Sequence, residues 1–132
     1  MEKLNIFCFG FGQVAKSFVE KIFAEKIPFE LNVTSRQKTE KKFLKKIEYN
    51  NFYFSEKKFD KELLTKLEKS NHILISVPPV ESEDIVIKNF YKNLQRLKPK
   101  WITYLSATSV YGNHDGEWVN ENSLTNPTSR SG

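Results

Sequence analysis

The segment Leu4–Glu25 constrains the fold most strongly, because a short apolar run, a glycine-rich turn and an amphipathic pattern follow one another without a gap. Leu4–Phe9 has the pattern of a buried strand, and Gly10 and Gly12 stand where a backbone must turn tightly and lie close to a pyrophosphate. Ala15 takes the place of a third glycine, where a small side chain lets helix and strand pack closely. The segment therefore predicts a strand, a phosphate-binding turn and a helix.

The turn supplies the first candidate ligand contacts. A helix that begins here directs its N-terminal amide groups and the positive end of its dipole toward phosphate charge. The expected contacts are Gly10, Phe11, Gly12, Gln13 and Val14. The alternative is a strand–turn–helix unit whose glycines serve only a tight turn. The position of the motif, between an apolar run and an amphipathic helix, favours nucleotide binding.

Along the rest of the chain, short apolar runs alternate with longer amphipathic segments, which is typical of parallel strands joined by crossover helices. The expected strands are Leu4–Phe9, Phe29–Thr34, Asn51–Phe54, Ile73–Val77 and Trp101–Ser106. The expected helices are Gln13–Glu25, Thr39–Lys46, Lys61–Lys69 and Ser82–Leu97. These elements predict one α/β domain, a Rossmann-like doubly wound parallel sheet of about five strands in the order 3-2-1-4-5 with helices on both faces. Residues 112–132 lack periodicity and are expected to be mostly loop.

The residues after the second expected strand indicate which dinucleotide is preferred. NAD-binding domains usually carry an Asp or Glu at this point to accept hydrogen bonds from the ribose 2′-hydroxyl, whereas a nearby Arg accommodates the 2′-phosphate of NADP. This sequence has Ser35 and Arg36 there and no acid, and a planar guanidinium suits a phosphate. NADP(H) is therefore the expected cofactor, with NAD as the alternative. The alternative interpretation involves no ligand, and Arg36 is then simply an exposed arginine in a polar loop.

Ser76 and Val77 end the fourth expected strand and Pro78 follows it, and these three residues complete the candidate cofactor contacts. Pro78 and Pro79 restrict the backbone where the chain turns away from the cofactor, and the Ser76 hydroxyl or the strand-end carbonyl can face a ribose. The prolines can equally serve only to end the strand. The sequence leaves both interpretations open.

The segment Tyr104–Gly112, taken together with the glycine turn, resembles the extended and atypical short-chain dehydrogenase/reductase family, also described as the NAD-dependent epimerase/dehydratase family. The glycine spacing is similar to an atypical branch with G-x-G-x-x-[AG]. The resemblance covers essentially the whole chain, and its further motifs are Thr34–Arg36, Ser76–Pro79, Gly116–Glu121 and Asn126–Ser129. It implies the NAD(P)-binding portion of an oxidoreductase or epimerase that acts on a sugar nucleotide or a similar carbonyl or hydroxyl substrate.

In that family a Ser or Thr, a Tyr and a Lys carry the chemistry, because the Tyr exchanges a proton with the substrate oxygen during hydride transfer and the Lys lowers its pKa. The matching positions hold Ala107 for the Ser and Ser131 for the Tyr, and the Lys position lies beyond Gly132. A serine hydroxyl is too weak an acid to replace a phenol. We therefore expect no catalytic residue in this chain, which we interpret as the N-terminal part of a longer protein. A non-catalytic NADP(H)-binding regulator or sensor is the alternative.

Composition narrows the remaining classes of protein. The net charge is +5, but the lysines are spread over nearly every expected helix, so a nucleic-acid partner is not expected.

No run approaches the roughly 18 apolar residues of a membrane span, and the N-terminus lacks the features of a signal peptide, so we expect a cytoplasmic protein. Cys8 is the only cysteine and lies in an apolar strand, which predicts a buried, inert thiol. His72 and His114 stand far apart and predict no metal site.

Overall fold

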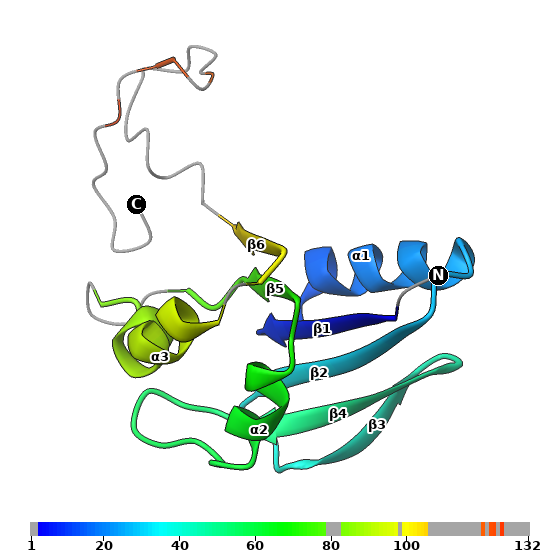
Figure 1. The fold of residues 1–132 in the computed structure, drawn as a ribbon, viewed down its shortest axis with the longest axis horizontal. Helices are drawn as coiled ribbons and strands as arrows, with labels where there is room; N and C mark the ends of the chain where they lie inside the picture. Colours follow the sequence, from blue (N-terminus) through cyan, green and yellow to red (C-terminus); the bar gives the residue numbers. More distant parts are fainter. Residues whose placement is uncertain are drawn as a thin grey trace.

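The computed structural model describes residues 3–78, 83–97 and 99–105, together with residues 120, 122, 123 and 125. These residues form an α/β fold around a six-stranded sheet (Figure 1). In chain order the elements are β1 (Leu4–Phe9), α1 (Gln13–Ala24), β2 (Phe29–Ser35), β3 (Glu40–Leu44), β4 (Ile47–Tyr53), α2 (Leu63–Glu68), β5 (His72–Ile75), α3 (Ile85–Arg96) and β6 (Trp101–Tyr104). Most of the expected elements are present, with ends shifted by a few residues.

The strand order is β3-β4-β2-β1-β5-β6, and every pair is parallel except β3 with β4. Leaving out β3, the order along the sheet is the predicted 3-2-1-4-5. The Rossmann-like fold class is therefore confirmed, with one antiparallel edge strand that the sequence did not predict. β1 lies in the middle, and its neighbours β2 and β5 continue the chain on opposite sides of it. The direction in which successive strands are added to the sheet therefore reverses at β1. Sheets of this kind bind their ligands at such a point.

The predicted helix Thr39–Lys46 is wrong, because Glu40–Leu44 forms the edge strand β3. It pairs antiparallel with β4 from Glu40 opposite Asn51 to Leu44 opposite Ile47. The turn between the two strands is tight, and Lys45 adopts a left-handed backbone with φ 56°. Pairing with β4 therefore outweighs the local helix preference of a lysine-rich run. Charged residues also suit an edge strand, since they discourage pairing with another chain.

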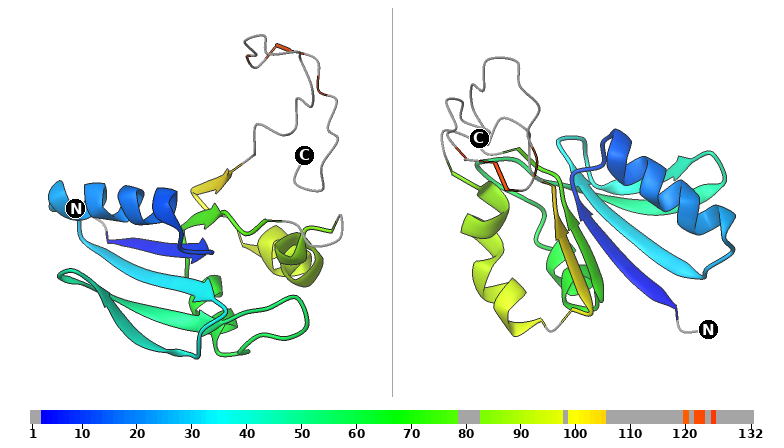
Figure 2. Two further views of the ribbon diagram at one scale, coloured as in Figure 1. Left: turned by 180° about the vertical axis from the view of Figure 1, so that it is seen from behind. Right: turned by 90° about the horizontal axis from the view of Figure 1, so that it is seen from above.

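Helices cover both faces of the sheet, as expected: α1 lies on one side and α3 on the other (Figure 2). The alternation of side chains along β1 explains the division, because successive strand residues point to opposite faces. Ile6 and Cys8 pack with α1, whereas Phe7 and Phe9 pack with α2 and α3. Both faces of β1 are therefore buried, as the continuous apolar run requires.

Cys8 is fully buried among the apolar side chains between β1 and α1. Burial disfavours the thiolate and raises the pKa of this thiol to about 12. The prediction of a buried thiol is confirmed. Within the described parts of the chain, every helix is too short or too polar to cross a bilayer.

Candidate functional site

A cavity of about 540 Å³ opens at the carboxyl ends of β1, β2 and β5, beside the N-terminus of α1. All the residues predicted to contact a cofactor line it, namely Gly10, Phe11, Gly12, Gln13, Val14, Ser35, Arg36, Ser76, Val77 and Pro78. The fold thus brings together three segments that are far apart in the sequence. That these residues contact a cofactor remains a prediction.

The cavity is also lined by residues that were not among the predicted contacts, namely Ala15, Thr34, Phe54, Ser55, Ile85 and Leu105. Ile85 begins α3 and Leu105 follows β6, so the wall they form depends on how distant elements pack. Ala15, Thr34 and Leu105 lay within motifs that the sequence singled out, namely the glycine motif, Thr34–Arg36 and Tyr104–Gly112.

A larger cavity of about 790 Å³ lies at the other end of the sheet. Its lining includes Phe23 from the end of α1, Phe29 from the start of β2 and Ile47 from the start of β4. It contains no part of the glycine turn. Parallel sheets bind ligands at the carboxyl ends of their strands, so the smaller cavity is the better candidate site.

Gly10 is required by the fold itself. Its φ is +87°, a backbone conformation that residues with a side chain rarely adopt. A Cβ atom built on it would lie 2.9 Å from the Ser76 hydroxyl oxygen and 3.3 Å from a methyl carbon of Val77. The close approach of β1 and β5 at this point therefore explains the glycine without a ligand.

Gly12 has no such explanation. Its backbone is extended, with φ −90° and ψ −164°, which any residue can adopt. A Cβ atom built on it would meet no atom of the described residues within 4 Å. The packing of the described residues thus places no demand for a glycine here. The space above Gly12 belongs to the cavity, where a bound group can approach the backbone.

The N-terminus of α1 faces the cavity without a side-chain cap. Gly12 is the N-cap residue and provides no capping hydrogen bond, and the first turn contains no acidic side chain. The Lys16 amide makes the first hydrogen bond of the helix, to the Gly12 carbonyl at 3.0 Å. The amides that precede it have no partner within the helix and carry the positive end of its dipole. This arrangement favours an anion.

Three hydrogen bonds hold the glycine turn against the neighbouring strands. The Gly10 amide donates to the Thr34 hydroxyl oxygen at 3.0 Å, which joins the turn to the end of β2. The Ser76 amide and hydroxyl both donate to the Phe9 carbonyl, at 2.9 and 3.2 Å. The Ser76 hydroxyl therefore serves the contact between β1 and β5. These bonds position the turn without a ligand.

Arg36 is exposed at the rim of the cavity, directly after β2. Among the described residues no carboxylate forms an ion pair with its guanidinium, which leaves it available to an anion. The neighbouring Ser35 hydroxyl donates to the Asn51 side-chain oxygen at 2.7 Å and accepts from the Gln37 amide at 3.1 Å. Ser35 is thus engaged within the protein, whereas the Arg36 guanidinium has no ion-pair partner in the part of the chain that the structure describes.

Asp84 joins α3 to β6 at the same end of the sheet. One carboxylate oxygen accepts from the amides of Val86 and Ile87, at 3.0 and 2.9 Å, and so caps α3. The other accepts a hydrogen bond from the Tyr104 hydroxyl. This bond, together with partial burial and the charge of Asp84, raises the pKa of Tyr104 to about 12. The contact fixes two elements that border the cavity.

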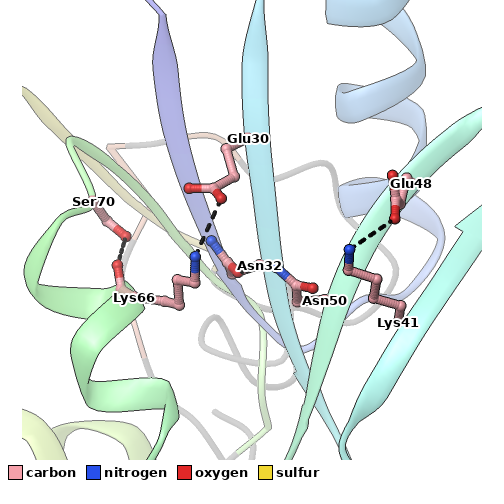
Figure 3. A network of polar contacts seen from close by, with 7 residues as sticks. All are labelled: Glu30, Asn32, Lys41, Glu48, Asn50, Lys66 and Ser70. Carbon is pink, nitrogen blue, oxygen red and sulfur yellow. Dashed lines mark hydrogen bonds and ion pairs between the residues drawn. The ribbon is translucent and has the colours of Figure 1, made fainter.

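A separate polar cluster lies on the face of the sheet covered by α2 (Figure 3). Lys66 of α2 pairs with Glu30 of β2 at 3.3 Å, and its carbonyl accepts from the Ser70 hydroxyl. The Asn50 amide donates to the Asn32 side-chain oxygen at 3.0 Å. None of these residues lines the 540 Å³ cavity. The cluster serves packing of α2 and the strands beneath it.

Several residues that the sequence singled out lie outside the described residues. They are Pro79 and the positions that match the family's catalytic Ser and Tyr, Ala107 and Ser131. The same holds for most of the expected loop 112–132. The expectations for them stay as stated above.

No protein-family model matches this sequence, and neither does any curated protein. Solved structures with a similar fold do exist. A functionally unknown conserved protein from Silicibacter pomeroyi superposes with a TM-score of 0.71 at 22% identity, over 99% of this chain and 44% of its own. The UDP-N-acetylglucosamine 4-epimerase of Bacillus cereus gives a TM-score of 0.63 at 17% identity, over 96% and 48%.

A short-chain dehydrogenase/reductase superfamily protein from Agrobacterium tumefaciens, solved with bound NAD, gives a TM-score of 0.59 at 12% identity, over 98% of this chain and 40% of its own. At these identities the likeness concerns the fold. The chain therefore has the Rossmann-like fold of the short-chain dehydrogenase/reductase and epimerase proteins, as the sequence motifs indicated. It spans less than half of the length of each of these structures.

Proposed function

We propose that this chain binds NADP(H) in the 540 Å³ cavity, as the cofactor-binding portion of a protein similar to the short-chain dehydrogenases and epimerases. The observation that carries the proposal is Gly12, whose missing side chain neither the backbone conformation nor the packing of the described residues explains. A pyrophosphate that lies against the backbone explains it. The uncapped N-terminus of α1 supplies amides and a dipole of the right sign for that group.

The preference for NADP(H) over NAD(H) rests on the end of β2. Arg36 is exposed at the cavity rim, and the loop 35–38 carries no acidic side chain that would accept hydrogen bonds from a ribose 2′-hydroxyl. Because the Ser35 hydroxyl already donates to Asn51, Arg36 is the group that pairs with the 2′-phosphate.

The substrate is proposed from resemblance alone. The Bacillus cereus protein acts on a nucleotide sugar according to its name, and this chain spans less than half of such proteins. We propose that the rest of the machinery, the catalytic Tyr and Lys included, belongs to a longer protein that acts on a sugar nucleotide or a similar carbonyl or hydroxyl compound. The second candidate, a non-catalytic NADP(H) sensor, is supported by Ala107 and Ser131 at the positions of the catalytic pair.

The substitution Gly12→Val tests the proposal. It places methyl groups where the pyrophosphate is expected, in a backbone conformation that valine adopts readily. We expect the variant to stay folded, with a loss of no more than about 1 kcal/mol for valine at an N-cap position, and to lose NADPH binding measured by calorimetry. Ala24→Val, at the exposed far end of the same helix, is the matched control and should bind NADPH normally. Unchanged NADPH affinity in Gly12→Val would remove the proposed site.

A further inference from the structure

We propose that Asn51 is a positioning residue that sets the preference of the cofactor site for a 2′-phosphate; this inference rests on the dinucleotide binding proposed above. Asn51 lies on β4, and only 2% of it is exposed. It does not line the 540 Å³ cavity. It acts through the crossing segment, residues 35–39, which carries Arg36.

The crossing segment exists because of the extra edge strand. β4 lies between β2 and β3 in the sheet, so the chain must pass over the end of β4 to reach β3. Only residues 36–39 are available for this passage. Asn51 pairs with Val33 on β2 and with Glu40 on β3, so it lies between the two points that the passage connects.

Among the described residues, every hydrogen bond of the Asn51 side chain goes to the crossing segment. Its amide nitrogen donates to the carbonyl oxygens of Gln37 and Lys38, at 3.2 and 2.9 Å. Its oxygen accepts from the Ser35 hydroxyl at 2.7 Å. A carboxamide offers two N–H donors on one side and an acceptor on the other, which is the set used here. An aspartate of the same shape would turn a carboxylate toward two carbonyl oxygens instead.

Further bonds tie both ends of the crossing segment to β4 and to the residue that follows it. The Phe54 amide donates to the Ser35 carbonyl at 2.8 Å, and the Tyr53 amide donates to the Thr39 hydroxyl oxygen at 3.0 Å. Arg36 therefore projects from a backbone that is held on both sides. A side chain on a preorganised backbone loses less entropy when it binds, so the same guanidinium binds a phosphate more tightly.

The effect of Asn51 should be confined to the 2′-phosphate. Backbone pairing of β4 with β2 and β3 holds the sheet without this side chain, and the glycine turn is fixed by Thr34 and Ser76. Loss of the Asn51 bonds therefore loosens Arg36 while leaving the pyrophosphate site intact. A general loss of structure would instead weaken NADPH and NADH alike.

The test compares Asn51→Asp and Asn51→Ala with Asn50→Asp, using NADPH and NADH as the two probes in calorimetric titrations. Asn50→Asp makes the same change of charge on the same strand, but Asn50 bonds to Asn32 in the cluster on the opposite face. We expect both Asn51 variants to lower the ratio of NADPH to NADH affinity about tenfold or more, the loss typical of one displaced charge-assisted hydrogen bond. NADH affinity should stay nearly unchanged, and Asn50→Asp should keep the ratio of the unaltered chain.

An unchanged ratio in both Asn51 variants, with normal NADPH binding by the unaltered chain, would overturn the role of Asn51 and leave the proposed function standing. Absence of NADPH binding by the unaltered chain would overturn both. Amide hydrogen exchange covers the case in which a variant does not fold. The Gln37 amide, bonded to Ser35, should be protected before NADPH is added. Protection that appears only with NADPH would show that the ligand, and not Asn51, orders the segment.

Discussion

The Gly10 amide donates a hydrogen bond to the Thr34 hydroxyl oxygen at 3.0 Å, and so the turn after the first strand is held by the end of the second. Thr34 is almost fully buried, with 1% of its surface exposed. A buried amide without an acceptor is costly, so this bond matters to the whole cavity edge. The left-handed turn at Gly10 and the position of Gly12 both depend on it.

Thr34→Val removes the acceptor and keeps the shape of the side chain. The Gly10 amide, which is partly buried, then loses its acceptor, and we expect the free energy of unfolding to fall by about 1 kcal/mol. Chemical denaturation monitored by circular dichroism measures this change. Thr65→Val on the exposed face of α2 is the matched control and should change stability by less than about 0.5 kcal/mol. Equal stability of the two variants would mean that the bond from Gly10 contributes nothing.

Substitution of Gly10 and of Gly12 should lower the free energy of unfolding by different amounts. Gly10→Ala forces a left-handed backbone on alanine and brings its Cβ to 2.9 Å from the Ser76 hydroxyl oxygen. We expect a loss of roughly 1–3 kcal/mol in the free energy of unfolding. Gly12→Ala, two residues on, has an extended backbone and open space, so it should lose only the smaller amount that alanine costs at an N-cap position, less than about 1 kcal/mol. Thermal unfolding of both variants side by side makes the comparison, and equal losses would contradict it.

The bond between Tyr104 and Asp84 should make stability depend on pH in the alkaline range. The folded-state pKa of Tyr104 is raised to about 12, first by this hydrogen bond, then by burial and the charge of Asp84. A raised pKa means that the stabilising effect is complete below the unfolded value near 10 and is lost as pH rises from about 10 to 12. Ultraviolet titration of tyrosinate should show one phenol at about 12 that disappears in Tyr104→Phe.

Asp84→Ala supplies the matching measurement. Without the carboxylate, the Tyr104 phenol should titrate closer to the ordinary tyrosine value. Loss of the cap on α3 should also lower the free energy of unfolding by about 0.5–2 kcal/mol. A Tyr104 titration that is the same in both proteins would show that Asp84 does not hold the phenol.

Local sequence patterns were sufficient to predict those elements whose local preference agrees with their pairing and packing in the folded protein. The apolar run, the glycines and the amphipathic segment predicted β1, the turn and the start of α1 at the residues where they occur. The alternation of strands and helices was enough for the order of the parallel strands. It also predicted that the candidate contact residues lie close together, because the carboxyl ends of parallel strands share one edge of the sheet. In the structure these residues line one cavity.

The edge strand and its consequences could not be predicted in the same way. β3 is lysine-rich and has no clear alternation, and it becomes a strand because the free edge of β4 offers backbone partners. Asn51 gains its role only when the chain crosses from β2 to β3 above it. One signal was present, since Asn50 and Asn51 are adjacent residues of a type that strands disfavour. Such a pair indicates side chains with specific partners in the folded protein.

Arg36→Asp should reverse the cofactor preference. The carboxylate would repel a 2′-phosphate and accept hydrogen bonds from a ribose 2′-hydroxyl. We therefore expect NADPH affinity to fall by about tenfold to a hundredfold, equivalent to about 1.5–3 kcal/mol. NADH affinity should be kept or should rise. Lys38→Asp makes the same charge change in the same segment, but Lys38 pairs with Glu40 at 3.6 Å and does not line the cavity. Its NADPH to NADH ratio should change much less. Equal shifts in the two variants would mean that the segment attracts the phosphate only through its net charge. A ratio that does not move in Arg36→Asp would show that the guanidinium does not bind the 2′-phosphate.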